Sequence, residues 1–190
     1  MLELYRDNCP RDHQPHIAFS PAAFPTYAKL EHPIFTALWV ADTYSTLIES
    51  GSENVSWPDL HSSTMIQSDG KNPGSAFMGL EMMHIVAHNP GDAFVNATSN
   101  DPSLAVYAVR RRDGYVGLML INEEPKSTAN VNVTIEGGNV VATGRRIDYG
   151  QEQQKSGASI VQSEINGTGA KFTVSVPAYT ITDILIPLAK

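Results

Sequence analysis

The stretch SLAVYAVRRRDGYVGLMLINEEP, residues 103–125, decides the fold class of this chain. Its two apolar runs, Leu104–Arg111 and Val116–Asn122, flank Asp113-Gly114, a pair that supplies the positive φ angles of a tight type I′ turn. The stretch therefore predicts a β-hairpin. Around it, short apolar–polar alternations joined by Gly, Asn and Ser are typical of an antiparallel β-sandwich of about seven or eight strands. The other expected strands include 93–99, 131–135, 140–148, 172–176 and 180–188.

Residues 1–90 differ in kind from residues 91–190, and we place a domain boundary between them. The first part follows the order strand, loop, helix, strand, loop, helix, which is the rhythm of a parallel sheet with helices packed outside it. Only two such units fit into this length, whereas a complete (β/α)₈ barrel needs about 250 residues. The sequence thus predicts a partial (β/α) barrel segment over 1–90 and a C-terminal β-sandwich over 91–190.

Two helices are expected in the first part, at Thr36–Ser50 and at residues 74–88. In the first of them, apolar side chains recur three and four residues apart, as on an amphipathic helix. The expected strands are Met1–Tyr5 and Asn54–Leu60. Residues 8–33 contain five prolines and are expected to form a long loop.

Composition argues against several classes of partner. The net charge is −7 and the one basic cluster is Arg110–Arg112, whereas nucleic-acid binding needs a basic face. The longest apolar runs have the length of a strand and fall short of the roughly 18–20 residues that a membrane span requires. Cys9 is the single cysteine, which excludes an intrachain disulfide and a Cys-based zinc site. The first thirty residues lack the apolar run of a signal peptide.

The order of motifs along the chain resembles the C-terminal part of clan A glycoside hydrolases of the arabinofuranosidase and cellulase-like type. PIFTALWVADTYSTLIESGSENVSWPDLH, residues 33–61, is similar to the last helix–strand passage of these barrels, and NPGSAFMGLEMMHIVAH, residues 72–88, to their last helix. The hairpin resembles the opening of their accessory sandwich, and VPAYTITDILIPL, residues 176–188, its final strand. The resemblance implies a mixed α and β fold, an incomplete (β/α) barrel with two helices followed by an antiparallel β-sandwich.

The same resemblance implies a secreted enzyme that hydrolyses glycosidic bonds in plant cell-wall polysaccharide, with no cofactor. Two glutamates act in such enzymes, with their carboxyl groups about 5–5.5 Å apart when configuration is retained. Glu3, in MLELY, matches the position of the nucleophile, whereas the acid on an earlier strand has no counterpart here. Loss of that acid costs a factor of about 10²–10⁴ in rate. We therefore expect catalysis only with the missing barrel.

Four further residues are candidates for substrate binding. Trp57 lies in the expected strand Asn54–Leu60 and either forms a stacking floor for a sugar ring or packs in the core. Asp59 and His61, on the same loop, either hydrogen-bond sugar hydroxyls or cap the loop. Tyr115, directly after the hairpin turn, is expected to be the most exposed tyrosine of the sandwich.

A metal site is the weaker interpretation of Glu81, His84 and His88. These residues are three and four apart and lie on one stripe of the expected helix, where paired histidines can bind zinc. The sequence is not H-E-x-x-H, however, and the polar stripe of an amphipathic helix explains all three side chains. No metal is predicted.

Two alternatives to a hydrolase portion stay open. The sandwich is either a non-catalytic carbohydrate-binding module, with exposed aromatic side chains, or a purely structural support for a barrel. In each case a carbohydrate polymer is the expected partner or substrate of the whole protein. Barrel strands normally pair at both edges, so a partial barrel predicts a homo-oligomer or association with the missing barrel segment.

Overall fold

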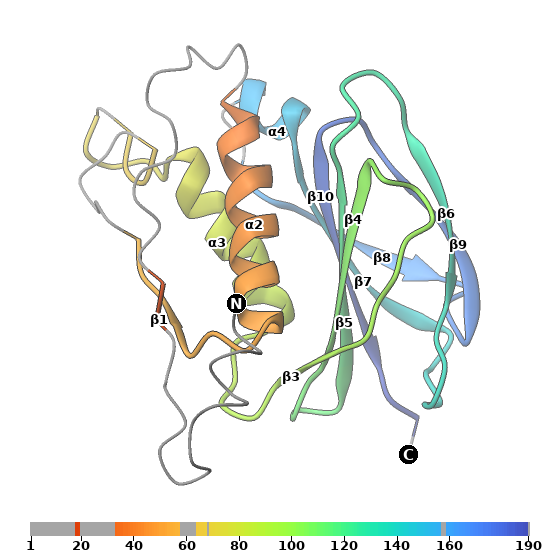
Figure 1. The fold of residues 1–190 in the computed structure, drawn as a ribbon. Coiled ribbons are helices and arrows are strands. Elements are labelled where there is room, and N and C mark those ends of the chain that lie inside the picture. The colour runs from red at the N-terminus through yellow and green to blue at the C-terminus, as the bar shows by residue number, and fades with distance from the viewer. Residues whose placement is uncertain (1–17, 20–32, 58–63, 68, 157–158, 190) are drawn as a thin grey trace, which may run out of the picture.

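The computed structural model describes residues 18–19, 33–57, 64–67, 69–156 and 159–189. Figure 1 shows two packed parts, a pair of helices beside a small parallel sheet and an antiparallel β-sandwich. The predicted fold class, mixed α and β with two helices ahead of a sandwich, is confirmed. Within the described ranges, no helix combines the length and the apolar character that crossing a membrane would require.

The first part has the expected strand–helix alternation. Strand β1 (Ala18–Phe19) pairs in parallel with β2 (Asn54–Val55), and helix α2 (Ile34–Glu49) connects them. Helix α3 (Ser75–Val86) follows β2. Both helices begin and end within about two residues of their predicted bounds, because the spacing of apolar residues marks a helix well.

The strands of this part were predicted less well. Ala18–Phe19 lies inside residues 8–33, which were expected to form a loop, and that expectation was wrong for these two residues. Two residues are too few to show an alternating pattern, so only the pairing with β2 identifies them. The expected strand Met1–Tyr5 lies outside the described residues.

The sandwich consists of two antiparallel sheets. One has six strands in the order β3-β4-β5-β10-β7-β8, and the other pairs β6 with β9. The short helix α4 (Gln151–Ser156) and strand β8 had no predicted counterpart. The strands are β3 (Ala93–Val95), β4 (Leu104–Arg110), β5 (Tyr115–Asn122), β6 (Ala129–Thr134), β7 (Thr143–Gly150), β8 (Val161–Asn166), β9 (Lys171–Val176) and β10 (Thr180–Pro187).

The predicted hairpin is confirmed, with a different turn. Strands β4 and β5 pair around Asp113-Gly114, but Gly114 has a φ of 87° whereas Asp113 does not have a positive φ. The amide of Gly114 donates to the carbonyl of Arg111, and the amide of Arg111 donates to the carbonyl of Tyr115. These bonds and the single positive φ define a three-residue loop with a bulge at the glycine. The predicted type I′ turn was therefore wrong.

The six-stranded sheet is covered on both faces. Along β10, Ile181 and Leu185 pack with residues of α2 and α3 in one cluster, whereas Ile184 and Ile186 pack with β6 and β9 in another. The alternation of side chains along a strand explains this division. A strand that is apolar on both faces reads as a continuous run in the sequence, as ITDILIP does apart from one acid.

Tyr107 of β4 ties the helices to the sandwich. Its hydroxyl donates to Oδ1 of Asp42 over 2.6 Å and lies 2.7 Å from Oγ1 of Thr46, and both partners are on α2. Burial and the hydrogen bond to Asp42 raise the pKa of Tyr107. A buried hydroxyl with partners on the opposite layer stabilises that one arrangement of helix and sheet.

Helices α2 and α3 approach closely at Gly79. A Cβ atom on this residue would lie 2.4 Å from the carbonyl oxygen of Ala37 on α2. Glycine inside a helix costs about 1 kcal/mol relative to alanine, so the close contact explains its presence.

We expect Gly79→Ala to lower the free energy of unfolding by about 1–3 kcal/mol, because the added methyl forces the helices apart. Urea denaturation followed by circular dichroism measures this change. The matched control is Gly138→Ala, whose Cβ would make an ordinary contact 3.8 Å from Leu188 and should leave stability unchanged. A Gly79→Ala variant as stable as the wild type would show that the two helices do not pack at this point.

The acid within the apolar run of β10 is Asp183. It has no exposed surface, and neither carboxylate oxygen has a hydrogen-bond partner in the described part of the chain. It stands on the helix-facing side of the sheet, opposite Met119 and Ile147 on the neighbouring strands. Burial, and secondarily the charge of Asp148, raises the pKa of Asp183 well above its ordinary value. Asp183 is therefore a neutral acid within the core.

Replacing this acid should stabilise the protein and change its response to pH. Because the folded-state pKa of Asp183 is raised, protonation of this group favours the folded state, and this stabilisation is complete below the unfolded pKa of about 4. The stabilisation is lost as pH rises through the folded-state pKa. We expect Asp183→Val to raise the free energy of unfolding at pH 7 by about 1–3 kcal/mol. The free energy of unfolding of this variant should also fall less than that of the wild type as pH rises.

Denaturation at a series of pH values measures both effects. Asp183→Asn is the matched control, since it removes the titration but keeps an unsatisfied polar group. Parallel stability curves for the wild type and Asp183→Val would contradict the assignment of a neutral, unpartnered acid.

Candidate functional site

Trp57 lies two residues after β2 and is half-buried. Its ring centroid is 6.2 Å from that of Tyr44, with the rings tilted by 37°. It packs against a buried cluster that includes Tyr44, Met65 and Ala76. These contacts favour the packing role that the sequence left open, while part of the ring stays accessible.

Three of the predicted site residues, Glu3, Asp59 and His61, lie outside the described residues. The structure therefore places only Trp57 and Tyr115. These two belong to different hydrophobic clusters, Trp57 beside the outer side of the helix pair and Tyr115 beside the cluster between helices and sheet. The structure does not bring them together into one site.

Tyr115 begins β5 and is half-buried, which makes it the most exposed of the four sandwich tyrosines, as expected. The guanidinium carbon of Arg111 lies 5.7 Å from the centre of its ring. The other three, Tyr107, Tyr149 and Tyr179, are buried. Tyr179 has a φ of 45° and its ring stands edge-on to Phe35 at 4.7 Å. Within the described residues the sandwich thus shows no row of exposed tyrosines.

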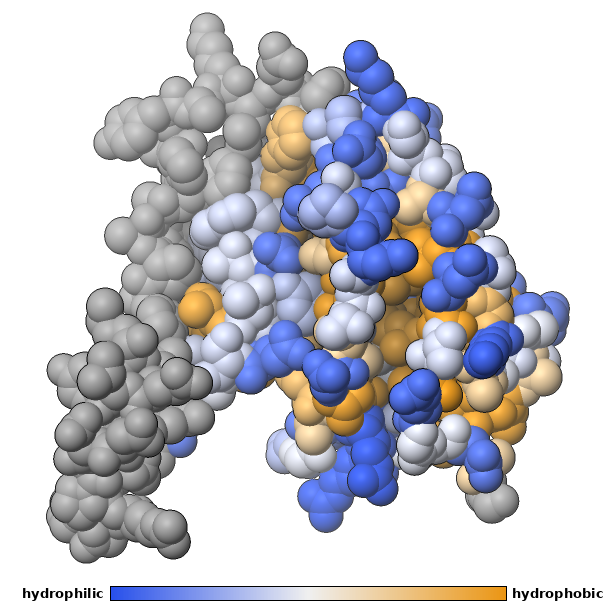
Figure 2. Space-filling view, turned by 45° about the vertical axis from the view of Figure 1, so that its right-hand side comes forward, coloured by the Kyte–Doolittle hydropathy of each residue, from blue (hydrophilic) through white to orange (hydrophobic). Residues whose placement is uncertain are grey.

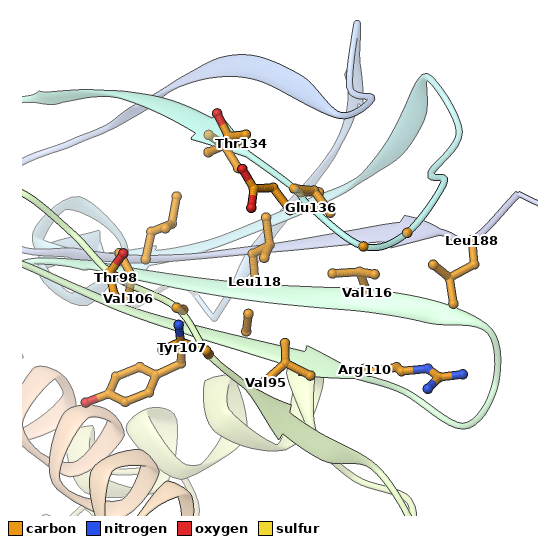
Figure 3. A pocket seen from close by; sticks show the side chains of 18 of the residues that line it. Val95, Thr98, Val106, Tyr107, Arg110, Val116, Leu118, Thr134, Glu136 and Leu188 are labelled. Carbon is orange, nitrogen blue, oxygen red and sulfur yellow. The ribbon is translucent and has the colours of Figure 1, made fainter.

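A hollow of about 970 Å³ opens between the two sheets of the sandwich. Figure 2 shows hydrophobic residues gathered on this side of the molecule. Figure 3 shows Val106, Val116 and Leu118 on the floor and Thr134 and Glu136 on the opposite wall. Tyr107 points away from the hollow, toward the helices (Figure 3).

This hollow is poorly suited to a sugar. Sugar rings stack on aromatic faces, and among the described lining residues the single aromatic side chain is that of Tyr107, which faces the other way. Glu136 is the one carboxylate of that lining, so a catalytic pair is absent from it. The predicted alternation over residues 131–135 agrees with the place of Val131 and Val133 in this lining, but it did not indicate that a two-stranded sheet would leave a hollow.

The helical stripe that suggested a metal site is exposed to different degrees. His84 and His88 are exposed and their ring centroids are 5.3 Å apart, while Glu81 is half-buried. Within the described residues, no group of three His, Cys, Asp or Glu side chains is arranged to hold a metal ion.

Several solved enzymes share this fold. A glycoside hydrolase family 30 subfamily 8 xylanase from Clostridium acetobutylicum matches 91% of this chain and 46% of its own, with a TM-score of 0.67 and 14% identity. An arabinose-bound family 51 α-L-arabinofuranosidase matches 97% of this chain and 34% of its own, with a TM-score of 0.68 and 16% identity. A family 44 xyloglucanase from Paenibacillus polymyxa matches 82% of this chain and 30% of its own, with a TM-score of 0.63 and 17% identity.

The predicted resemblance to clan A glycoside hydrolases is confirmed at the level of the fold. The chain spans less than half of the length of each of these glycoside hydrolases. No protein-family model matches the sequence, and no curated protein does. The similarity thus rests on structure, and it supports the predicted order of a partial barrel segment followed by a sandwich.

The role of Trp57 can be tested by truncation. We expect Trp57→Ala to lower the free energy of unfolding by about 2 kcal/mol, because most of a large aromatic surface leaves its packed position. Trp57→Phe, which keeps an aromatic ring beside Tyr44, should lose less than half of that amount. Denaturation midpoints of the three proteins measure the difference. Wild-type stability in Trp57→Ala would favour the stacking-floor interpretation instead.

Proposed function

We propose that this chain supplies the last helices of the barrel and the accessory β-sandwich of a polysaccharide-degrading glycoside hydrolase. It takes part in the hydrolysis of glycosidic bonds of plant cell-wall polysaccharide only together with the rest of the barrel. The observation that carries the proposal is the fold match over 91% of this chain to less than half of a xylanase. The other enzymes with this fold are named for xyloglucan and arabinofuranoside substrates, which belong to the same class of material.

In this proposal Glu3 is the nucleophile, and its acid partner comes from the rest of the barrel. A retaining mechanism needs the two carboxyl groups about 5–5.5 Å apart on either side of the glycosidic oxygen. The hollow between the sheets has one carboxylate among its described lining residues, Glu136. A second pocket, which lies between α3 and the strands β7 and β8, has no carboxylate among its described lining residues. The isolated chain accordingly turns over little or no substrate.

The sandwich supports the helices in this proposal, and a separate carbohydrate-binding role is not favoured. Its buried tyrosines are used for packing, as Tyr107 is in its contact with α2. Strand β5 also meets α3 closely, since a Cβ atom on Gly117 would lie 3.0 Å from the carbonyl oxygen of Val86. A freely attached binding module would not require such close contacts with the helices.

The proposal includes a partner for the parallel strands. Strands β1 and β2 form a two-stranded parallel sheet within the described residues, whereas parallel strands are normally paired at both edges and buried on both faces. Ile66 and Phe77, each 42% exposed, add apolar surface in the same part of the chain. The partner is the rest of the barrel, or a second copy when that is lacking.

We also propose that the whole protein acts outside the cell, where plant polysaccharide is found. The four Asn-x-Ser/Thr sequons are compatible with this, because the asparagine of each is exposed and a glycan would not disturb the core. These are Asn54, Asn96, Asn132 and Asn166.

Assays on xylan, xyloglucan and aryl arabinofuranosides test the catalytic claim. We expect the isolated chain to give no more product than its Glu3→Gln variant, because leaving-group protonation is absent. Robust turnover that Glu3→Gln abolishes, and that Glu53→Gln on the exposed surface does not, would contradict the proposal and indicate a complete enzyme.

The gene itself provides the complementary test. We expect the DNA on the 5′ side of the Met1 codon to continue the reading frame and to encode further strand–helix units. One of their strands should end in an Asn-Glu pair whose glutamate is the catalytic acid. A promoter and stop codons directly upstream would count against a role as one part of a larger hydrolase.

A further inference from the structure

A second pocket, of about 230 Å³, lies between α3 and the strands β7 and β8. Its polar lining residues are His84, His88, Arg111, Arg145 and Gln162, above an apolar floor that includes Ile147. No carboxylate lines it among the described residues, although the protein has 20 acidic and 13 basic residues. The pocket is thus a locally basic site on an acidic protein.

Arg111 fixes the orientation of one of these histidines. It is 5% exposed, and its guanidinium donates to Oδ1 of Asp113 over 3.0 Å and to the carbonyl of Ile85 over 2.6 Å. Its Nη2 also lies 3.2 Å from Nε2 of His88. A guanidinium can only donate, so Nε2 of His88 accepts and Nδ1 carries the proton. His88 is thereby held as a hydrogen-bond donor through Nδ1.

Arg145 supplies an exposed positive charge to the pocket. Within the described residues it has no carboxylate at ion-pair distance, although Glu164 stands opposite it on β8. Its neighbour Arg146 points to the other face of the sheet and is paired with Asp148 at 2.6 Å. The nearby carboxylates of Asp113 and Asp92 are already engaged, by Arg111 and by backbone amides respectively.

We infer that this pocket binds a small oxyanion, a phosphate group or a carboxylate, through Arg145, His88 and Gln162. The planar guanidinium of Arg145 matches two oxygens of such a group, and the imidazole and the amide each add an N–H donor. Arg111 acts as a positioning residue, since four of its five N–H donors are engaged by protein groups. The two sources of this chemistry are free inorganic phosphate and the carboxylate of an acidic sugar.

The test is a titration of the full chain with sodium phosphate and, separately, with sodium glucuronate, at constant ionic strength. Calorimetry gives the affinity, and ¹H–¹⁵N spectra locate the bound anion. We expect dissociation constants of roughly millimolar size, as befits ligands with so few atoms. The amides of His88, Arg145 and Gln162 should shift together on binding.

Arg145→Ala and Arg145→Gln should each weaken binding at least about tenfold, because the guanidinium charge that pairs with the bound anion is lost. Both replace an exposed side chain, and unchanged circular dichroism confirms that they fold. Arg110→Ala is the matched control, an exposed arginine on the opposite face of the sheet, and should bind as the wild type does.

Saturable binding of either anion that depends on Arg145 supports the site, and the preferred anion identifies the source. Binding of neither anion would overturn the inference. So would binding that Arg110→Ala weakens as much as Arg145→Ala, since it would reflect general surface charge. None of these outcomes depends on hydrolysis, so a failure here and a failure of the proposed function are distinguishable.

Discussion

Burial of both faces of the six-stranded sheet is the constraint on which the rest of the structure depends. One face lies under α2 and α3 and the other under β6 and β9, so the central strand β10 is buried along most of its length. The helices would have no partner without the sheet, and the sheet would expose an apolar face without the helices. Two contacts position the helices more specifically than burial alone. The hydroxyl of Tyr107 hydrogen-bonds α2 to the sheet, and Gly79 lets α3 approach α2 closely.

This arrangement explains why the sandwich offers little for a sugar to bind. Three of its tyrosines fill the helix-facing cluster and Tyr115 packs against that cluster, while its hollow is lined mainly by aliphatic side chains. A sheet that must bury both faces has few positions left for exposed aromatic residues. A basic set of polar side chains lies instead at the edge of the helix layer, where His88, Arg111 and Arg145 line one pocket beside β7 and β8. Asp183 is the acid that interrupts the apolar run of β10, and it is tolerated as a neutral acid.

The candidate site could be predicted only in part. Trp57 and Tyr115 were both singled out, and their partial exposure agrees with the sequence pattern, yet they lie in different clusters. Residues far apart in the sequence meet only through the packing of elements, which periodicity does not describe. The basic pocket was missed for the same reason. Its histidines were noticed as a helical stripe, but Arg145 and Gln162 come from strands whose position beside α3 no local pattern reveals.

By itself the sequence determined the two helices, the hairpin at Asp113-Gly114 and the apolar alternation of the sandwich, because each depends on residues within about one element length. The order of its motifs also predicted a resemblance to clan A glycoside hydrolases, and the solved enzymes confirm this resemblance at the level of the fold. Only the tertiary structure decided the turn geometry at Gly114, the short strand Ala18–Phe19 and the faces that β10 buries. Those features arise from pairing and packing between distant segments, where burial and hydrogen bonding override local preference.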